Sequence, residues 1–140
     1  MHFSYEDLRP LALQLADLLP IKRPIITFSR GGLDTVALVA RYLSWKPTVY
    51  SFDPADTNHS TASRLAQFVL PVFIDDLLDT GRTFENVSRV FPRIHASPYL
   101  VLFDKQTEKR IATPPNLHAA QTIVTEEWIV FPWELQGTNS

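Results

Sequence analysis

The stretch VFIDDLLDTGRTF at residues 72–84 decides how this sequence is expected to fold. Its apolar first part predicts a buried β-strand, and its second part predicts a turn of small residues that leads into a helix. Three carboxylates, those of Asp75, Asp76 and Asp79, come at the end of the predicted strand. In an open α/β sheet, ligands bind beyond the carboxyl ends of the strands. We therefore expect these acids at a ligand site.

The four residues Thr80, Gly81, Arg82 and Thr83 follow the acids at a predicted helix N-terminus, with Thr83 as its cap. Backbone N–H groups and the helix dipole bind phosphate at such a place, and a glycine lets the backbone approach closely. Acids beside a phosphate site are compatible if they hold Mg²⁺ or sugar hydroxyls while the amides hold the phosphate. The alternative is a strand end with solvated acids and a capped helix.

Outward from this stretch, predicted strands and helices alternate along a single domain, residues 1–140. Apolar periodicity and turn residues predict helices over 4–19, 33–43 and 83–90. Apolar runs predict strands over 24–29, 47–52, 71–75 and 98–103, with short candidates at 122–124 and 128–131. Loops are expected over 53–63 and 112–120. Almost continuously apolar strands are typical of a parallel sheet covered on both faces.

Composition excludes several kinds of protein. The 140 residues contain no cysteine, so disulfides, thiolate metal sites and a cysteine nucleophile are excluded. Thirteen basic against fifteen acidic residues give a net charge of −2, without the basic excess of a general nucleic-acid binder. No apolar run reaches the ~18 residues of a membrane span, and no signal-peptide pattern precedes the first predicted helix. The phosphate-binding P-loop, dinucleotide and GxSxG motifs are also absent.

The stretch VFIDDLLDTGRT resembles the phosphoribosyl-pyrophosphate (PRPP) motif of type I phosphoribosyltransferases, with Pro71 as a mild departure. In that motif apolar residues precede two acids, two further apolar residues, a third acid and T-G-x-T. FSRGGLDTVALVARYL (28–43) resembles the strand–loop–helix of bacterial xanthine-guanine phosphoribosyltransferases, and EWIVFPWE (127–134) resembles their purine-contacting end. The resemblance covers nearly the whole chain.

This resemblance implies a three-layer α/β fold, with a mostly parallel central sheet flanked by helices and a small hood formed by the chain ends. It implies Mg²⁺-dependent transfer of ribose 5-phosphate from PRPP to a 6-oxopurine (guanine, xanthine or hypoxanthine), which gives the nucleoside monophosphate and pyrophosphate in purine salvage. Relatives are dimers or tetramers, so a cytoplasmic homodimer or homotetramer is expected. No nucleic-acid partner and no membrane span are expected.

On the PRPP side, the resemblance gives each motif residue a role. Asp75 and Asp76 would hold the ribose hydroxyls, directly or through Mg²⁺, and Asp79 would act as general base near N7 of the purine. The 5′-phosphate would be held by Thr80, Gly81, Arg82 and Thr83. Arg30 and Gly31 match the family's pyrophosphate loop, which often has an unusual peptide geometry; an arginine fork suits phosphate oxygens. The alternative for Arg30 is a surface charge after a strand.

On the purine side, Lys105 matches the lysine that reads the 6-oxo group, Trp128 would stack on the base, and Ile129 would offer backbone groups to its edge. Without the resemblance, Lys105 reads as a solvated turn lysine and Trp128 as a core residue. Phe131 and Trp133 are assigned to packing. Glu134 lies where relatives carry an acid.

The family's mobile lid corresponds to residues 53–69, where Arg64 is a candidate pyrophosphate contact, His59 is taken as a solvent-exposed residue, and closure would exclude water. Asp34 is a candidate helix cap.

A non-catalytic regulator that senses PRPP or a nucleotide on the same fold remains the alternative, because fold alone does not fix function. Regulators often lose the third acid and the base-reading residues, and this chain keeps Asp79, Lys105 and Trp128.

Overall fold

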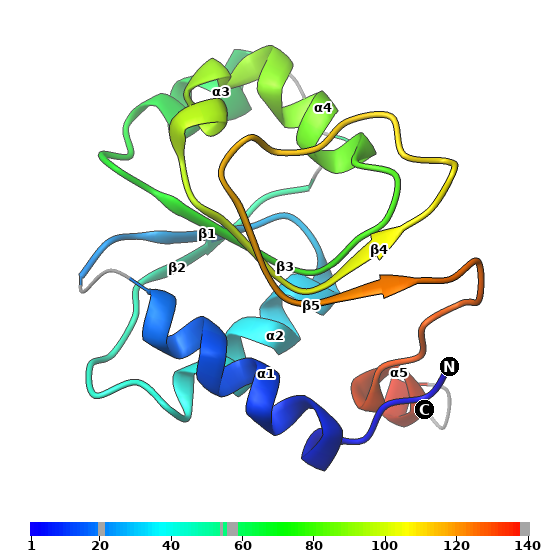
Figure 1. Ribbon diagram of the computed structural model, residues 1–140. Coiled ribbons are helices and arrows are strands. Elements are labelled where there is room, and N and C mark those ends of the chain that lie inside the picture. Colours follow the sequence, from blue (N-terminus) through cyan, green and yellow to red (C-terminus); the bar gives the residue numbers. More distant parts are fainter. Residues whose placement is uncertain (20–21, 54, 56–58, 138–140) are drawn as a thin grey trace.

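The computed structural model describes residues 1–19, 22–53, 55 and 59–137. The elements, in chain order, are α1 (Tyr5–Leu18), β1 (Ile25–Thr27), α2 (Arg30–Ala40), β2 (Val49–Ser51), α3 (His59–Ala66), β3 (Val72–Leu78), α4 (Arg82–Val90), the 3₁₀ helix η1 (Pro92–Ala96), β4 (Tyr99–Gln106), β5 (Leu117–Val124) and α5 (Pro132–Gly137). Figure 1 shows them coloured along the chain.

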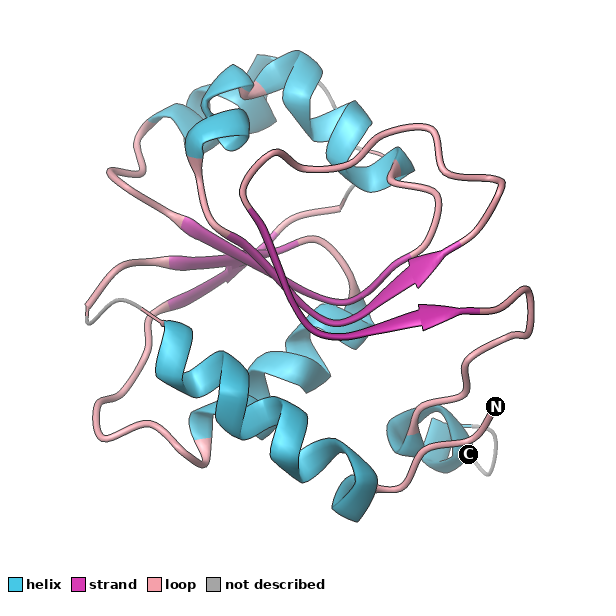
Figure 2. Cartoon of the chain, viewed as in Figure 1, coloured by secondary structure: helices cyan, strands magenta, loops and turns pink. Residues whose placement is uncertain are grey.

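The five described strands form one sheet in the order β2-β1-β3-β4-β5, and every pair is parallel. Helices α1 and α2 cover one face of the sheet, while α3 and α4 cover the other (Figure 2). The predicted α/β class, three layers around a parallel sheet, is confirmed. None of the described helices is long and apolar enough to cross a membrane.

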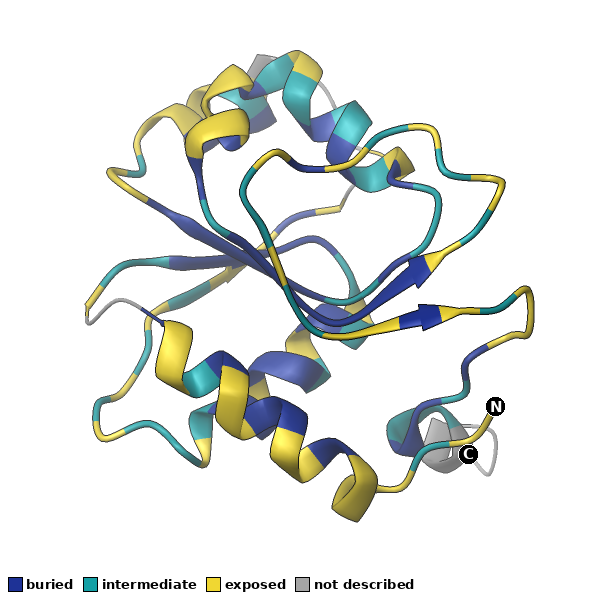
Figure 3. Ribbon diagram, in the orientation of Figure 1, coloured by how far each residue is buried: buried dark blue, intermediate teal, exposed yellow. Residues whose placement is uncertain are grey.

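Alternate residues of the central strands build two apolar cores, because side chains point to opposite faces with a period of two. Val72 and Ile74 join the core beneath α1 and α2. Phe73, which lies between them, joins the core beneath α3 and α4. Figure 3 shows most of β1, β3 and β4 buried, whereas most of β5 at the sheet edge is exposed or half-buried.

The chain ends pair beside the carboxyl ends of β4 and β5, as the expected hood requires (Figure 1). His2 forms a parallel bridge with Val130. The backbone N–H of Phe3 donates to the Val130 carbonyl at 3.0 Å, and that of Val130 donates to the Met1 carbonyl at 2.7 Å. Helix α5 follows this pairing directly.

Helix α2 begins at Arg30, three residues before the predicted start, because the Ser29 hydroxyl accepts a hydrogen bond from the Gly32 N–H and caps it. The predicted glycine turn is thus the first helical turn, and the described residues contain no cis peptide bond. Asp34 lies inside α2 and does not cap it. The cap predicted for Thr83 is also wrong, because Gly81 is the N-cap of α4.

Two predicted loops are partly regular structure. Residues 59–66 form α3, whose polar sequence contains the fully buried Leu65 together with the buried Thr61. Residues 117–124 form β5, which is stabilised by its backbone pairing with β4 rather than by an apolar run. The strand predicted at 128–131 is reduced to the single bridge at Val130. The remaining predicted helices and strands are present with shifted ends.

Replacing Phe73 by alanine should lower the free energy of unfolding by about 3–5 kcal/mol, because it empties a fully packed aromatic site. Phe73 is 1 % exposed and contacts the rings of Phe28, Phe91 and Tyr99. Chemical denaturation measures the change. The matched control is Val124→Ala on β5, where the side chain is 80 % exposed and the loss should stay below about 0.5 kcal/mol. Equal losses in both variants would contradict the described core.

Candidate active site

The sheet changes direction of winding between β1 and β3, because β2 lies on one side of β1 and β3 lies on the other. The two strands pair only over Ile25–Val72 and Ile26–Phe73. Beyond this point β1 ends at Thr27, whereas β3 continues to Leu78. Ligands of open parallel sheets bind at such a switch point, outside the carboxyl ends of the strands.

The Ser29 hydroxyl connects three elements at this point. It donates a hydrogen bond to Oδ1 of Asp75 on β3 at 2.8 Å, and it accepts the N–H of Gly32 in α2 at 2.8 Å. Asp75 Oδ1 also accepts the backbone N–H of Asp76 at 2.9 Å. Asp75 is therefore a buried acid with fixed partners, not a solvated strand-end residue as the alternative reading of the motif supposed.

Burial dominates the electrostatics of the two adjacent acids. It raises the pKa of Asp75 above its ordinary value. It also raises the pKa of Asp76 to about 9, with the negative charge of Asp75 as the second cause. Burial and the same two acids raise the pKa of the Tyr99 phenol, which keeps that group protonated. Without a ligand, the two acids at this edge of the sheet are therefore stabilised by a bound proton or by a cation.

The donor set at the two acids fits Mg²⁺ that is completed by a substrate. Mg²⁺ usually takes one or two carboxylates together with phosphate oxygens and water, rather than a cage of protein ligands. Asp75 and Asp76 supply such a pair. Within the described part of the chain, no group of three or more His, Cys, Asp or Glu residues is arranged to hold a metal.

A cavity of about 340 Å³ lies where α2 begins. Its lining residues are Arg30, Gly31, Asp34, Asp76, Trp133 and Glu134. A Cβ at Gly31 would collide with the Asp76 carboxylate, so a larger residue there would force the Asp76 side chain out of its position against the first turn of α2. The structure thus brings together Arg30, Gly31 and Asp76, which the sequence places on different elements.

A second cavity, of about 120 Å³, is lined by the segment that leads into α4. Its lining includes Asp75 and Asp79, all four residues from Thr80 to Thr83, and Tyr99. Gly81 adopts φ 84°, which disfavours other residues, and a Cβ there would collide with the Ala112 carbonyl. The cavity opens at the N-terminus of a nine-residue helix, where backbone amides and the dipole suit a phosphate.

Lys105 lies inside β4, not in the turn after it, and only 5 % of it is exposed. Its Nζ lies 3.9 Å from Oδ2 of Asp79. The register that pairs Leu78 with Asp104 brings these two neighbouring residues together across β3 and β4. The solvated turn lysine that the sequence allowed is excluded by this burial, and the site holds a cation directly beside the third acid.

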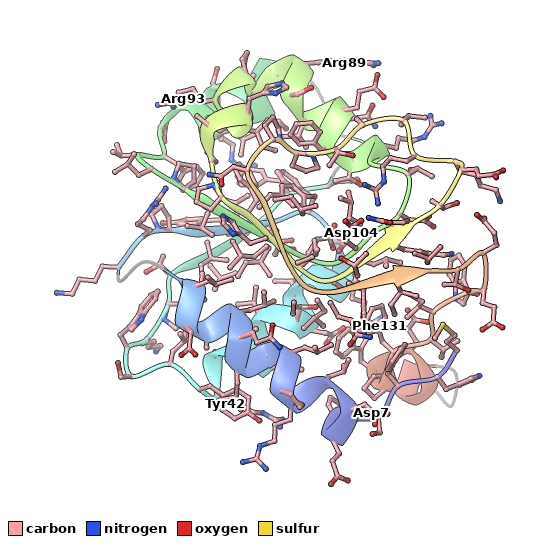
Figure 4. The ribbon with its side chains drawn as sticks, in the orientation of Figure 1. Asp7, Tyr42, Arg89, Arg93, Asp104 and Phe131 are labelled. Atoms are coloured by element: carbon pink, nitrogen blue, oxygen red, sulfur yellow. The ribbon has the colours of Figure 1, made fainter. Side chains whose placement is uncertain are left out.

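The structure does not bring Trp128 and Ile129 to either cavity. Trp128 is 71 % exposed, and Ile129 is 2 % exposed within the apolar core. Trp133, which the sequence assigned to packing, stacks on Phe131 with ring centroids 4.8 Å apart and also lines the larger cavity. Figure 4 shows Phe131 between β5 and α5. The sequence alone does not show which of the two tryptophans in 127–134 lies at a cavity, because this depends on the position of α5.

Arg64, the candidate pyrophosphate contact, lies over the ring of Phe52 at 4.6 Å in the described structure. His59 begins α3. Residues 54 and 56–58 of the predicted lid lie outside the described residues. Two residues with contacts near the site, Ser29 and Arg110, were not predicted from the sequence. The cap position before a helix could have indicated Ser29, but nothing in the sequence indicates the contacts of Arg110.

Solved structures that share this fold include purine phosphoribosyltransferases. The chain resembles in fold the xanthine-guanine-hypoxanthine phosphoribosyltransferase of Helicobacter pylori, with 20 % identity, coverage of 99 % of this chain and 95 % of that one, and a TM-score of 0.67. It also resembles the purine phosphoribosyltransferase of Pyrococcus horikoshii Ot3, with 23 % identity, coverage of 95 % and 92 %, and a TM-score of 0.63.

A curated relative fixes the family. The chain is 31 % identical to the xanthine-guanine phosphoribosyltransferase of Desulfotalea psychrophila, over an alignment of 146 residues that covers 95 % of this chain and 82 % of the relative. No family model matches the sequence. On this identity and coverage, the chain belongs to the type I phosphoribosyltransferase family.

The acid pair should make the stability of the chain depend on pH. Because the pKa of Asp76 rises from 3.8 to about 9 on folding, the folded chain holds a proton that the unfolded chain releases over this range. The contribution of Asp76 to the free energy of unfolding is greatest below its unfolded pKa and falls as the pH rises toward 9. Without divalent cations, the melting temperature should fall from about pH 5 to about pH 9 by less in Asp76→Asn than in the native chain.

Glu108→Gln makes the same replacement of a carboxyl by an amide in an exposed turn and serves as the control. It should keep the pH dependence of the native chain. If the two variants show the same dependence, the buried pair is not its source.

Proposed function

We propose that this protein is a Mg²⁺-dependent purine phosphoribosyltransferase that transfers ribose 5-phosphate from PRPP to a 6-oxopurine in purine salvage. The observation that carries the proposal is the pair of Lys105 and Asp79, whose Nζ and Oδ2 atoms lie 3.9 Å apart beside the phosphate-binding segment. A 6-oxopurine offers an oxygen for the cation and, at N7, a proton for the carboxylate. The relatives' names, which specify purine phosphoribosyltransferases, support the same class.

In this proposal the chain orients PRPP by its two charged ends. Backbone amides of residues 80–83 hold the 5′-phosphate at the start of α4. Arg30 and the backbone at Gly31 hold pyrophosphate oxygens in the larger cavity, where Asp76 and the first turn of α2 already meet. Clamping both ends places the anomeric carbon of the ribose between them, so orientation supplies part of the rate acceleration.

Asp75 and Asp76 would hold Mg²⁺, which supplies positive charge for the developing pyrophosphate when it is bound. Asp75 is itself oriented by Ser29 and by the Asp76 N–H, so its carboxylate keeps one position while ligands enter. This orientation costs no reorganisation at the moment of reaction.

At the purine, Asp79 acts as general base at N7 and Lys105 donates to the 6-oxygen. The buried position of Lys105 favours a substrate atom that accepts hydrogen bonds over the exocyclic amino group of adenine. Trp128 and Ile129, which are expected at the base, would have to approach it from the hood when the substrate binds. Of the two tryptophans in 127–134, Trp133 is the one that lines the larger cavity in the structure.

The same proposal includes a homodimer or homotetramer in the cytoplasm, with small-molecule substrates and no nucleic-acid partner. The net charge of −2 supports the last point. Leu13 and Leu18, which are 40 % and 48 % exposed on α1, are available for an interface. A regulator on the same fold would not need the pair of the buried Lys105 and the half-buried Asp79, so this pair favours the enzyme.

Incubation with PRPP, Mg²⁺ and each of guanine, xanthine, hypoxanthine and adenine tests the proposal. Nucleoside monophosphate should form from one or more of the 6-oxopurines and not from adenine. Liquid chromatography of the products measures this. A chain that forms no nucleotide from any base is not the proposed enzyme, and a product from adenine alone would contradict the role of Lys105.

Asp79→Asn should lower kcat by about 10²–10⁴-fold, because it removes the proton acceptor but leaves a side chain of the same shape. Steady-state rates with the preferred 6-oxopurine measure the loss. Glu85→Gln is the control, since Glu85 is a nearby acid of α4 whose ion pair with Arg89 is exposed. A rate within about twofold of the native chain for Asp79→Asn would exclude Asp79 as the base.

A further inference from the structure

Arg110 bridges the carboxyl ends of β3 and β4 from the turn that follows β4. Its Nε donates to the carbonyl oxygen of Asp79 at 2.6 Å. Its Nη2 donates to the carbonyl oxygens of Lys105 at 2.8 Å and of Leu78 at 3.3 Å. One guanidinium therefore holds the backbone of both residues whose side chains form the 3.9 Å pair at the candidate base site.

The charge of Arg110 is matched within the protein. Nη2 lies 2.5 Å from Oδ1 of Asp104, and only 17 % and 12 % of the two side chains are exposed. Nη1 donates to the Thr113 hydroxyl at 3.0 Å. Asp104 lies near the end of β4, labelled in Figure 4, and pairs in register with Leu78 of β3. Because its donors are directed at protein acceptors, Arg110 is suited to hold the frame of the site rather than to bind a substrate anion.

We infer that Arg110 is a positioning residue for purine phosphoribosyl transfer, which fixes the relative placement of the Asp79 carboxylate and the Lys105 ammonium. This inference rests on the proposed function of that pair. Without the guanidinium, the two strand ends lose the link between their carbonyl groups, and Asp79, which follows the last residue of β3, gains freedom. A displacement of about 1 Å at a reacting group can cost about 100-fold in rate.

The segment that is proposed to bind phosphate is held by other hydrogen bonds, which come from the backbone that follows Arg110. The N–H groups of Ile111 and Ala112 donate to the Thr80 carbonyl at 2.7 and 3.3 Å. These hydrogen bonds support the segment around the smaller cavity and do not use the Arg110 side chain. A substitution at Arg110 should therefore affect the base-reacting pair more than the binding of the PRPP phosphate.

Arg110→Gln should lower kcat by about tenfold or more, while KM for PRPP should stay within about threefold of the native value. Arg110→Lys should not restore the rate, because an ammonium cannot reproduce the planar fork that reaches several acceptors. Arg89→Gln is the matched control. Arg89 lies on the outer side of α4, where Figure 4 labels it, and its exposed ion pair with Glu85 measures 3.5 Å; kcat and KM should not change.

A double-mutant cycle distinguishes positioning from general stability. If Arg110 acts through Asp79, Arg110→Gln should cost a clearly smaller factor in kcat when Asp79 is already asparagine. A purely structural role would cost the same factor in both backgrounds. Equal factors, or an unchanged kcat in Arg110→Gln, would overturn the inference.

Should Arg110→Gln fail to fold, Asp104→Asn replaces it, since this variant keeps an acceptor near Nη2 and removes the charge. Its kcat should also fall at unchanged KM for PRPP, and a native kcat would overturn the inference. The two proposals can fail independently. A native chain without transferase activity contradicts the proposed function. An active native chain whose Arg110 and Asp104 variants are equally active contradicts only the role of Arg110.

Discussion

The hydrogen bonds of the Ser29 hydroxyl are the constraint on which the site depends. The group donates to Asp75 and accepts from Gly32, so it ties the end of β1 to the start of α2 and to β3 at 2.8 Å on each side. This link lies where the sheet switches direction, and the larger cavity opens beside it. Because Ser29 both caps α2 and orients Asp75, a single side chain couples the helix that carries Arg30 and Gly31 to the strand that carries the acids.

Two adjacent acids with raised pKa values and the buried polar atoms that lack a partner collect in the same region. Asp75 and Asp76 are adjacent acids whose pKa values are raised by burial. Among the described residues, the buried Thr27 hydroxyl oxygen and the Trp133 indole nitrogen have no hydrogen-bond partner. Thr27 lies against Gly32, and Trp133 lines the larger cavity. Native proteins satisfy most buried polar groups, and departures from such rules are expected at functional sites.

Residues 72–84 allowed much of the fold to be predicted, because a strand, a glycine turn and a helix follow one another with clear local signals. Two elements were missed for physical reasons. Helix α3 has a polar sequence in which Leu65 is the buried apolar residue and Thr61 is also buried, and β5 is an edge strand that depends on the backbone of β4. Long-range pairing of this kind overrides local propensity and leaves little trace in the residues themselves.

In the candidate site, too, some features could be predicted from local sequence, whereas others depend on contacts between distant parts of the chain. The acids and the proposed phosphate-binding segment, residues 80–83, are contiguous in sequence, so their proximity could be predicted. The meeting of Lys105 with Asp79 depends on strand register, and the placement of Trp133 rather than Trp128 at a cavity depends on α5. Arg110 could not be found at all, because three of its partners are backbone carbonyls, and those of Leu78 and Asp79 are distant in the chain.

A crystal structure of the chain with guanosine 5′-monophosphate tests the central claim most directly, because it locates both ends of the proposed product. The account predicts the phosphate against the backbone of residues 80–83 and the 6-oxygen of the base within hydrogen-bond distance of Lys105 Nζ, with N7 facing Asp79. A nucleotide whose phosphate lies elsewhere, or whose base does not approach Lys105 and Asp79, would contradict it.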